Sequence, residues 1–382
     1  MKREKPRRVI VITGKSVKNS KSPKKPPSFL IKKLIVVIKY PLDLRPKNKR
    51  KNMFTKNLSA FRLAAKGEAK IAARAARVRA IALVTASKKI KALLAGLFLA
   101  STLSAAPLNV VTTINYFDDL IEQVAGSLVK HQGLMGEGVD PHMYQATAND
   151  LKTIEEADLV VYGGLHLEGK MDDIFSDLGK KGKVQTLNLS EALDKKTLFE
   201  EGGEYDPHVW FDTNNFALQA DFLAKKLGEM DKENAAKYKA NAERFKGELK
   251  ELESYIKARF KDIPANSRYL VTVHDAFSYF ARQFGLEVKP VMGVTTDAQT
   301  SLKEIKELTD FIVAHKVKAI FTESSTPAKS ILKLQEGAKA QGFEVKVGKE
   351  LYSDSMGSKE DGHETYVKTL KYNADTIADA LK

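Results

Sequence analysis

Hydrophobic positions from Leu108 onward alternate between two periodicities. Short apolar runs rich in β-branched residues recur along the chain, and segments with apolar residues at helical spacing separate them. The runs that predict buried strands are residues 109–113, 159–162, 269–273, 318–322 and 344–347. Strands that alternate with helices usually form parallel sheets, whose buried strands are continuously apolar. The pattern therefore predicts an α/β fold with mainly parallel sheets.

One segment, residues 232–262, has no proline, a single glycine, many Lys and Glu residues and one apolar stripe. The stripe consists of Tyr238, Phe245, Leu249, Leu252, Ile256 and Phe260. Its spacing predicts one helix of about thirty residues, roughly 45 Å long at 1.5 Å per residue. Because strand patterns lie on both sides of it, this helix either links two α/β lobes, residues 107–231 and 263–382, or is an ordinary surface helix. The pattern leaves both interpretations open.

The N-terminal part of the chain has the character of a leader. Residues 88–106 begin with three lysines, continue as an apolar run and end with small residues. This is the layout of a secretory signal peptide. We therefore expect a secretory signal peptide at 88–106, with cleavage close to Pro107.

Residues 1–87 precede this signal, although a signal peptide normally begins the chain. One explanation is that 1–87 is a basic leader that results from a misassigned start, with the true start at or after Met53. The other is a genuine basic extension that binds nucleic acid or an anionic membrane. We favour the first, because no basic-aromatic pattern of a known nucleic-acid fold is present. N-terminal sequencing of the native protein distinguishes the two.

Charge is distributed unevenly over the 382 residues. The chain has 63 basic and 48 acidic residues. Residues 1–106 contain 28 of the basic and 3 of the acidic residues, so residues 107–382 contain 35 basic and 45 acidic residues and have a net charge of −10. The chain has no Cys, which excludes disulfides, thiolate nucleophiles, zinc ribbons, iron–sulfur clusters and a lipid-anchor Cys. We therefore expect an acidic body without a lipid anchor. Any metal must bind to imidazole, carboxylate or carbonyl groups.

Three of the seven histidines and one aspartate have settings that suit a metal ligand. His142 and His208 each follow Asp-Pro, where proline restricts the backbone and lowers the cost of fixing an imidazole. His274 follows the strand predicted at 269–273, at the sheet edge where α/β proteins bind ligands, and Asp354 follows another strand-like run. Three imidazoles and a carboxylate suit a borderline divalent cation, although each residue alone is more often a surface or capping residue. We expect the remaining histidines to be structural or solvent-facing: His131, His166, His315 and His363.

Four segments of the chain, two on each side of the long helix, together resemble a known family. In chain order they are residues 138–150, 206–210, 273–280 and 352–357. They look like the metal-specific solute-binding proteins of bacterial ABC importers, the TroA-like group with a helical backbone, and the resemblance covers residues 107–382. It implies two α/β lobes joined by one long helix, with a single divalent ion held in the cleft between the lobes.

The resemblance also implies the ligands and the partners. The matching residues are His142 and His208 from the N-terminal lobe and His274 and Asp354 from the C-terminal lobe. Asp140, Asp206 and Glu323 are expected near the site as capping or supporting residues and not as ligands. The expected partners are an ABC permease with its ATPase, without nucleic acid, and the protein is expected to be a monomer. Its expected location is the periplasm, where it is free or held by an uncleaved signal.

The metal that the resemblance implies is manganese or zinc, and iron also fits. The His-rich insertion of dedicated zinc importers is missing, since only His166 lies between His142 and His208. Manganese-specific members of the family usually carry Glu at the position of His274, so the resemblance implies that this site favours zinc more than theirs does. Zinc also binds more tightly than manganese or iron at most sites of this kind, so supply and geometry decide which ion is used.

Two other classes of protein remain as alternatives. A zinc-dependent hydrolase needs an open coordination position and a general base. Four protein ligands would fill the shell, and no His-Glu-x-x-His sequence occurs, so we do not expect an enzyme. An adhesin or interaction protein would keep its surface binding when all four ligands are mutated.

Overall fold

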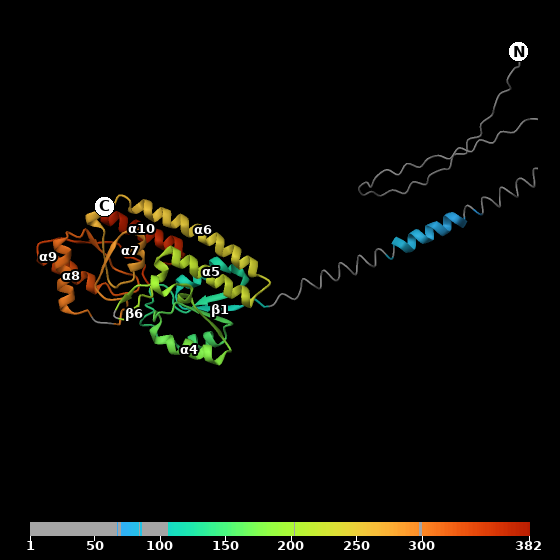
Figure 1. Ribbon diagram of the computed structural model, residues 1–382, viewed down its shortest axis with the longest axis horizontal. Coiled ribbons are helices and arrows are strands. Elements are labelled where there is room, and N and C mark those ends of the chain that lie inside the picture. Colours follow the sequence, from blue (N-terminus) through green and yellow to red (C-terminus); the bar gives the residue numbers. More distant parts are fainter. Residues whose placement is uncertain (1–66, 68–69, 84, 86–105, 202, 298–299) are drawn as a thin grey trace, which may run out of the picture. The chain divides into compact units, whose positions relative to one another are not determined.

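The computed structural model describes residues 67, 70–83, 85, 106–201, 203–297 and 300–382 (Figure 1). The chain divides into two compact units, Met1–Leu103 and Ser104–Lys382. In the first unit, residues 70–83 form an exposed helix. The rest of the predicted leader and the predicted signal peptide at 88–106 lie almost entirely outside the described residues. Among the helices that are described, none combines the length and apolar character needed to cross a bilayer.

The first sheet has four parallel strands in the order β2-β1-β3-β4. The central strands β1 and β3 are apolar and buried, as the sequence pattern predicts, whereas β2 lies at an edge and is largely exposed. The strands are β1 (Asn109–Thr112), β2 (Lys130–Gly133), β3 (Leu159–Tyr162) and β4 (Gln185–Asn188). The helices of this lobe are α2 (Asn115–Val124), α3 (Ala148–Glu155), α4 (Asp172–Lys181) and α5 (Thr213–Met230).

The second sheet repeats this topology with the order β10-β9-β7-β8. Its first strand in sequence is again central, with the second strand on one side and the third and fourth on the other. The strands are β7 (Tyr269–Thr272), β8 (Glu287–Pro290), β9 (Ala319–Ile320) and β10 (Lys346–Val347). The helices are α7 (Ser278–Phe284), α8 (Leu302–Ala314), α9 (Lys329–Ala340) and α10 (Tyr366–Leu381). The prediction of two parallel-sheet α/β lobes is therefore confirmed.

Shorter elements complete the fold. An antiparallel pair, β5 (Glu200–Glu201) and β6 (Glu204–Tyr205), precedes His208. The 3-10 turns are η1 (Gly126–Leu128), η2 (Gly169–Met171), η3 (Leu189–Ala192), η4 (Lys195–Thr197), η5 (Val209–Phe211) and η6 (Ala265–Ser267). These turns shape the connections between strands and helices.

The long helix α6 (Ala235–Phe260) contacts both lobes. Its predicted apolar stripe is buried from Tyr238 to Phe260. It packs against α5 and α2 of the first lobe and against α10 and α7 of the second, and Figure 1 shows it running alongside α10. Residues 232–234 form a turn, so the helix begins later than predicted. The lobe boundaries themselves stay predictions, because residues 104–382 form one compact unit.

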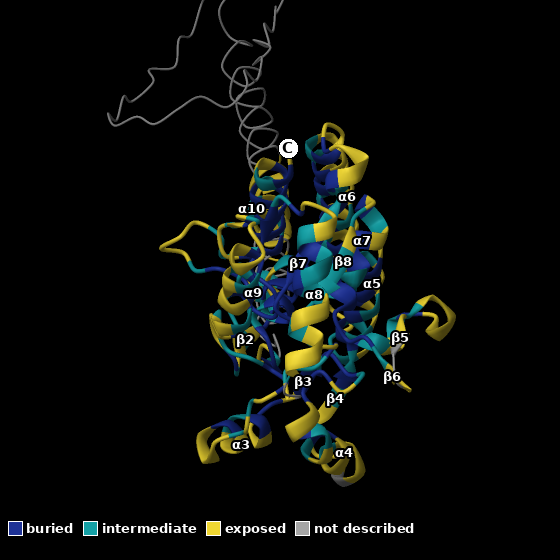
Figure 2. Cartoon of the chain, turned by 90° about the vertical axis from the view of Figure 1, so that its left-hand side faces the viewer, coloured by how far each residue is buried: buried dark blue, intermediate teal, exposed yellow. Residues whose placement is uncertain are grey.

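Burial follows this arrangement (Figure 2). One hydrophobic core extends from the first sheet through α5 and α6 to α7 and α10. A second core lies between the second sheet and helices α8 and α9, whose outer sides are exposed. Because the larger core contains side chains from both lobes, the lobes are packed together as well as covalently linked.

Candidate metal centre

The structure brings all four predicted ligands together. One ligand atom from each of His142, His208, His274 and Asp354 lies within 4.8 Å of the others. The Nε2 atom of His208 is 3.3 Å from Nε2 of His142, 3.3 Å from Nε2 of His274 and 3.2 Å from Oδ1 of Asp354. His142 is 5% exposed and the other three are fully buried. Residues separated by up to 212 positions thus form one compact donor set.

The two Asp-Pro-His segments fold in the same way. In each, the aspartate carboxylate accepts the backbone N–H of the histidine two residues later, at 2.9 Å from Asp140 to His142 and at 2.9 Å from Asp206 to His208. Proline has no N–H, so the first backbone donor that this carboxylate can reach belongs to the histidine. The repeated tripeptide therefore fixes the backbone at both predicted ligands.

Two of the histidine rings are also oriented by a carboxylate. Nδ1 of His208 lies 2.8 Å from Oδ1 of Asp206, and Nδ1 of His274 lies 2.5 Å from Oε2 of Glu323. With Nδ1–H donated in this way, Nε2 of each ring presents its lone pair to the cluster. Asp206 and Glu323 therefore lie next to the candidate site and orient the rings of two predicted ligands. Nδ1 of His142 has no hydrogen-bond partner within the described part of the chain.

Asp354 is held by groups that the sequence did not reveal. The hydroxyl of Ser325 donates to Oδ2 of Asp354 at 3.0 Å. Asn373 binds the backbone of Tyr352, two residues before Asp354. Its Oδ1 accepts from the backbone N–H of Tyr352 at 3.0 Å, and its Nδ2 donates to the carbonyl of Tyr352 at 2.7 Å. Ser and Asn residues are common throughout the chain, so only the tertiary structure identifies these contacts.

The electrostatics of the centre favour a cation. Burial lowers the pKa of His142 to about 3, so its imidazole is neutral. Burial also lowers the pKa of His208, but hydrogen bonds and charges from Asp206 and Asp354 outweigh it and raise the value to about 9. Burial raises the pKa of Asp354, yet the neighbouring His274 and His208 hold it well below the usual range. A metal ion would replace protons at this centre, since metal binding requires neutral imidazoles.

The other histidines lie outside this cluster, as predicted. His166 is largely exposed and lies 2.6 Å from an oxygen of Asp172. The remaining three make separate contacts: His131 with Asp118, His315 with Phe311 and His363 with Tyr372.

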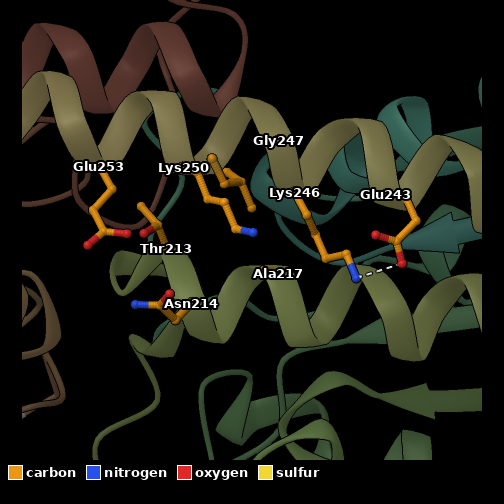
Figure 3. Close-up of a pocket in the computed structure, with 9 residues that line it drawn as sticks. Thr213, Asn214, Ala217, Glu243, Lys246, Gly247, Lys250 and Glu253 are labelled. Atoms are coloured by element: carbon orange, nitrogen blue, oxygen red, sulfur yellow. Dashed lines mark hydrogen bonds and ion pairs between the residues drawn. The ribbon is translucent and has the colours of Figure 1, made fainter.

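A separate groove lies between α5 and α6 (Figure 3). Thr213 and Asn214 line it from the start of α5, and Lys246 and Glu243 line it from α6. Lys246 forms ion pairs with Glu243 and Asp221. The groove shares no residue with the four-residue cluster.

Comparison with known proteins agrees with this geometry. Residues 110–380 match the family described as zinc-uptake complex component A, periplasmic (ZnuA). The chain is 39% identical over 277 residues to the manganese-binding lipoprotein MntA of Bacillus subtilis, covering 72% of this chain and 90% of that protein. It is 41% identical over 277 residues to the zinc-binding protein TroA of Treponema pallidum, covering 71% and 88%.

Solved structures agree as well. The structure of periplasmic zinc-binding TroA from Treponema pallidum aligns with a TM-score of 0.70 at 38% identity, covering 72% of this chain and 99% of that one. Fe(III)-bound YtgA from Chlamydia trachomatis aligns with a TM-score of 0.65 at 25% identity, covering 72% and 98%. With its two lobes and its matched span, the chain belongs to the ZnuA family of metal-binding, solute-binding proteins of ABC importers.

Proposed function

We propose that this protein is an extracytoplasmic receptor that binds one divalent ion, manganese or zinc, through His142, His208, His274 and Asp354. The ion is cargo, which the receptor delivers to the permease of an ABC importer. The observation that carries the proposal is the compact set of four buried donors, three imidazoles and one carboxylate, within 4.8 Å of one another. A structural role alone would not require so many ionisable groups at one buried point, because burying charge without a counter-ion is costly.

The donor set supports zinc, manganese and iron as candidate ions. Imidazole suits zinc and iron, and the carboxylate extends the range to manganese. The relatives divide in the same way, since MntA is named for manganese and TroA for zinc, and YtgA was solved with Fe(III). We propose manganese or zinc as the physiological ion, with iron as a further candidate.

Membership of the ABC importer family also supports the remaining parts of the proposal. Its partners would be a permease and an ATPase, and its location the periplasm. Residues 88–106 would serve as the signal peptide. The lobes would comprise residues 107–231 and 263–382.

Burial argues against the alternative of a zinc hydrolase. A hydrolase must admit a peptide or ester to the metal and leave a coordination position open for water. Here three of the four donors are fully buried, and the four of them can satisfy a tetrahedral ion without water. No surface feature of the described residues favours an adhesin over a receptor.

Metal binding by single variants tests the proposed ligands. We expect His142→Ala and Asp354→Ala each to weaken zinc binding by at least about a hundredfold, measured by titration against a competing chelator, because each removes a coordinating atom. His166→Ala is the matched control, since His166 is exposed and lies outside the cluster. Unchanged zinc affinity in both ligand variants would overturn the site.

A further inference from the structure

The start of helix α2 in the first lobe contacts the loop of the second lobe that carries Asp354. Oδ1 of Asn115 accepts the backbone N–H of Met356 at 2.8 Å, and Nδ2 of Asn115 donates to the carbonyl of Met356 at 3.2 Å. One side-chain amide thus binds both backbone groups of a residue only two positions beyond Asp354. Paired hydrogen bonds of this kind fix orientation as well as distance.

The neighbouring residue Tyr116 lies among the side chains that surround the predicted ligands. Tyr116 is fully buried. The ring of Tyr116 packs 5.4 Å from that of Trp210, which in turn lies 5.3 Å from the ring of His208. The first turn of α2 is therefore part of the surroundings of the metal centre.

Two further contacts join the first lobe to the same region of the second. The backbone N–H of Gly138, in the loop that carries His142, donates to the hydroxyl of Ser355 at 2.8 Å. The carboxylate of Asp119, on α2, accepts the backbone N–H of Tyr366 at the start of α10 at 2.9 Å. The loop after Asp354 is thus held from the opposite lobe at two successive residues.

On its other side, Asp354 is anchored within its own lobe. Asn373 of α10 holds Tyr352 by two hydrogen bonds, and Ser325 donates to Asp354. Asp354 therefore lies between one anchor in the second lobe, at Tyr352, and one in the first lobe, at Met356. Separation of the lobes must break the Asn115 contact or pull the loop that carries Asp354 away from its anchors in the second lobe.

We propose that Asn115 is a positioning residue that couples contact between the lobes to retention of the metal ion. While the amide holds Met356, Asp354 stays in place beside His208 and His274. When the lobes separate, this contact breaks and Asp354 moves away from His142 and His208 of the first lobe, so the four donors no longer surround the ion. This inference rests on the proposed function, because it takes Asp354 to be a ligand.

The expected effect is a faster release of the ion. Removing groups that orient metal ligands typically costs 10- to 100-fold in affinity, and Asn115 acts through the backbone of a neighbouring residue, so we expect an effect of about tenfold. The effect should appear in the dissociation rate of the ion, because the two Asn115–Met356 hydrogen bonds stabilise the metal-loaded protein with its lobes in contact. The association rate should change little.

The test is stopped-flow zinc release from the full-length protein. Wild type, Asn115→Ala and Ser355→Ala are loaded with one equivalent of zinc and mixed with an excess of a chromophoric chelator. Asn115→Ala should release zinc about tenfold faster than wild type. Ser355→Ala removes a second hydrogen bond between this loop and the first lobe, the one with Gly138, and should also release faster, by a smaller factor. If Asn115→Ala does not fold, the zinc release rate of Ser355→Ala tests the proposed coupling.

Asn241→Ala is the matched control. Nδ2 of Asn241, on α6, donates to the carbonyl of Val124 at 3.0 Å, so this variant removes an amide contact at the other end of α2 without touching the Asp354 loop. It should release zinc at the wild-type rate. Wild-type rates in both Asn115→Ala and Ser355→Ala, or equal acceleration in Asn241→Ala, would overturn the coupling while leaving the receptor intact. Failure of the wild type to retain zinc would instead overturn the proposed function and this inference together.

Discussion

Glu323 lies 2.5 Å from Nδ1 of His274, although 49 positions separate the two residues in sequence. The same carboxylate accepts the backbone N–H groups of Val273 and His274 at 2.7 and 3.1 Å. Glu323 therefore fixes both the end of strand β7 and the ring that projects from it. Asp206 does the same for His208 in the first lobe. Each lobe thus contributes one histidine whose orientation is set by a buried carboxylate.

Replacing this carboxylate should weaken metal binding without removing a ligand. We expect Glu323→Gln to lower zinc affinity by about 10- to 100-fold, because a neutral amide holds the Nδ1–H of His274 less strongly than a carboxylate does. Titration against a competing chelator measures the effect. Glu304→Gln is a control, since Glu304 caps α8 and lies outside the centre. Equal affinities in Glu323→Gln and wild type would refute the orienting role.

Trp210 should report metal binding by its fluorescence. It is the single tryptophan of the chain, it is fully buried, and its ring lies 5.3 Å from the ring of His208 in an edge-on arrangement. A cation on His208 changes the charge next to the indole, so zinc should change the emission until one equivalent has been added. His208→Ala should abolish the change. Emission that stays constant while zinc demonstrably binds would place the ion elsewhere.

Asp119 should make stability depend on pH. Burial raises the pKa of Asp119 from 3.8 to about 6, against hydrogen bonds from Tyr366 and Gln123. A carboxyl with a raised folded-state pKa contributes stability that is present below pH 3.8 and is lost as the pH rises through about 6. Asp119→Asn can still accept from Tyr366 and does not ionise. It should therefore gain stability relative to wild type as the pH rises, by at most about 3 kcal/mol.

Urea unfolding between about pH 4 and pH 8 measures this difference. The exposed Asp173→Asn is the control and should show no such trend relative to wild type. A constant difference in stability between Asp119→Asn and wild type across this range would contradict the raised pKa.

The parts of the fold that could be predicted from sequence are those with strong patterns. Buried central strands such as β1 and β7 appear as continuous apolar runs, and the stripe of α6 is visible from Tyr238 to Phe260. The edge strands β2 and β8 are short and half exposed, with polar residues such as Lys130 and Glu287, so no apolar run identifies them. Strands β9 and β10 are only two residues long, shorter than the apolar runs predict.

The candidate site divides in the same way. His142 and His208 could be found because Asp-Pro-His occurs twice, and His274 and Asp354 because each follows a predicted strand or strand-like run. Asn115, Ser325 and Asn373 could not be found, because their importance lies in contacts across the fold; Asn115 and Met356 are 241 positions apart. A single Asn or Ser in sequence gives no indication of its tertiary partner.

Competitive metal loading followed by native mass spectrometry tests the central claim most directly. The purified protein is stripped of metal, supplied with zinc, manganese and iron(II) together, and weighed without denaturation. The account predicts one tightly held zinc or manganese ion per chain, and its loss in Asp354→Ala. A protein that holds no ion, or holds one equally well without Asp354, would contradict the account.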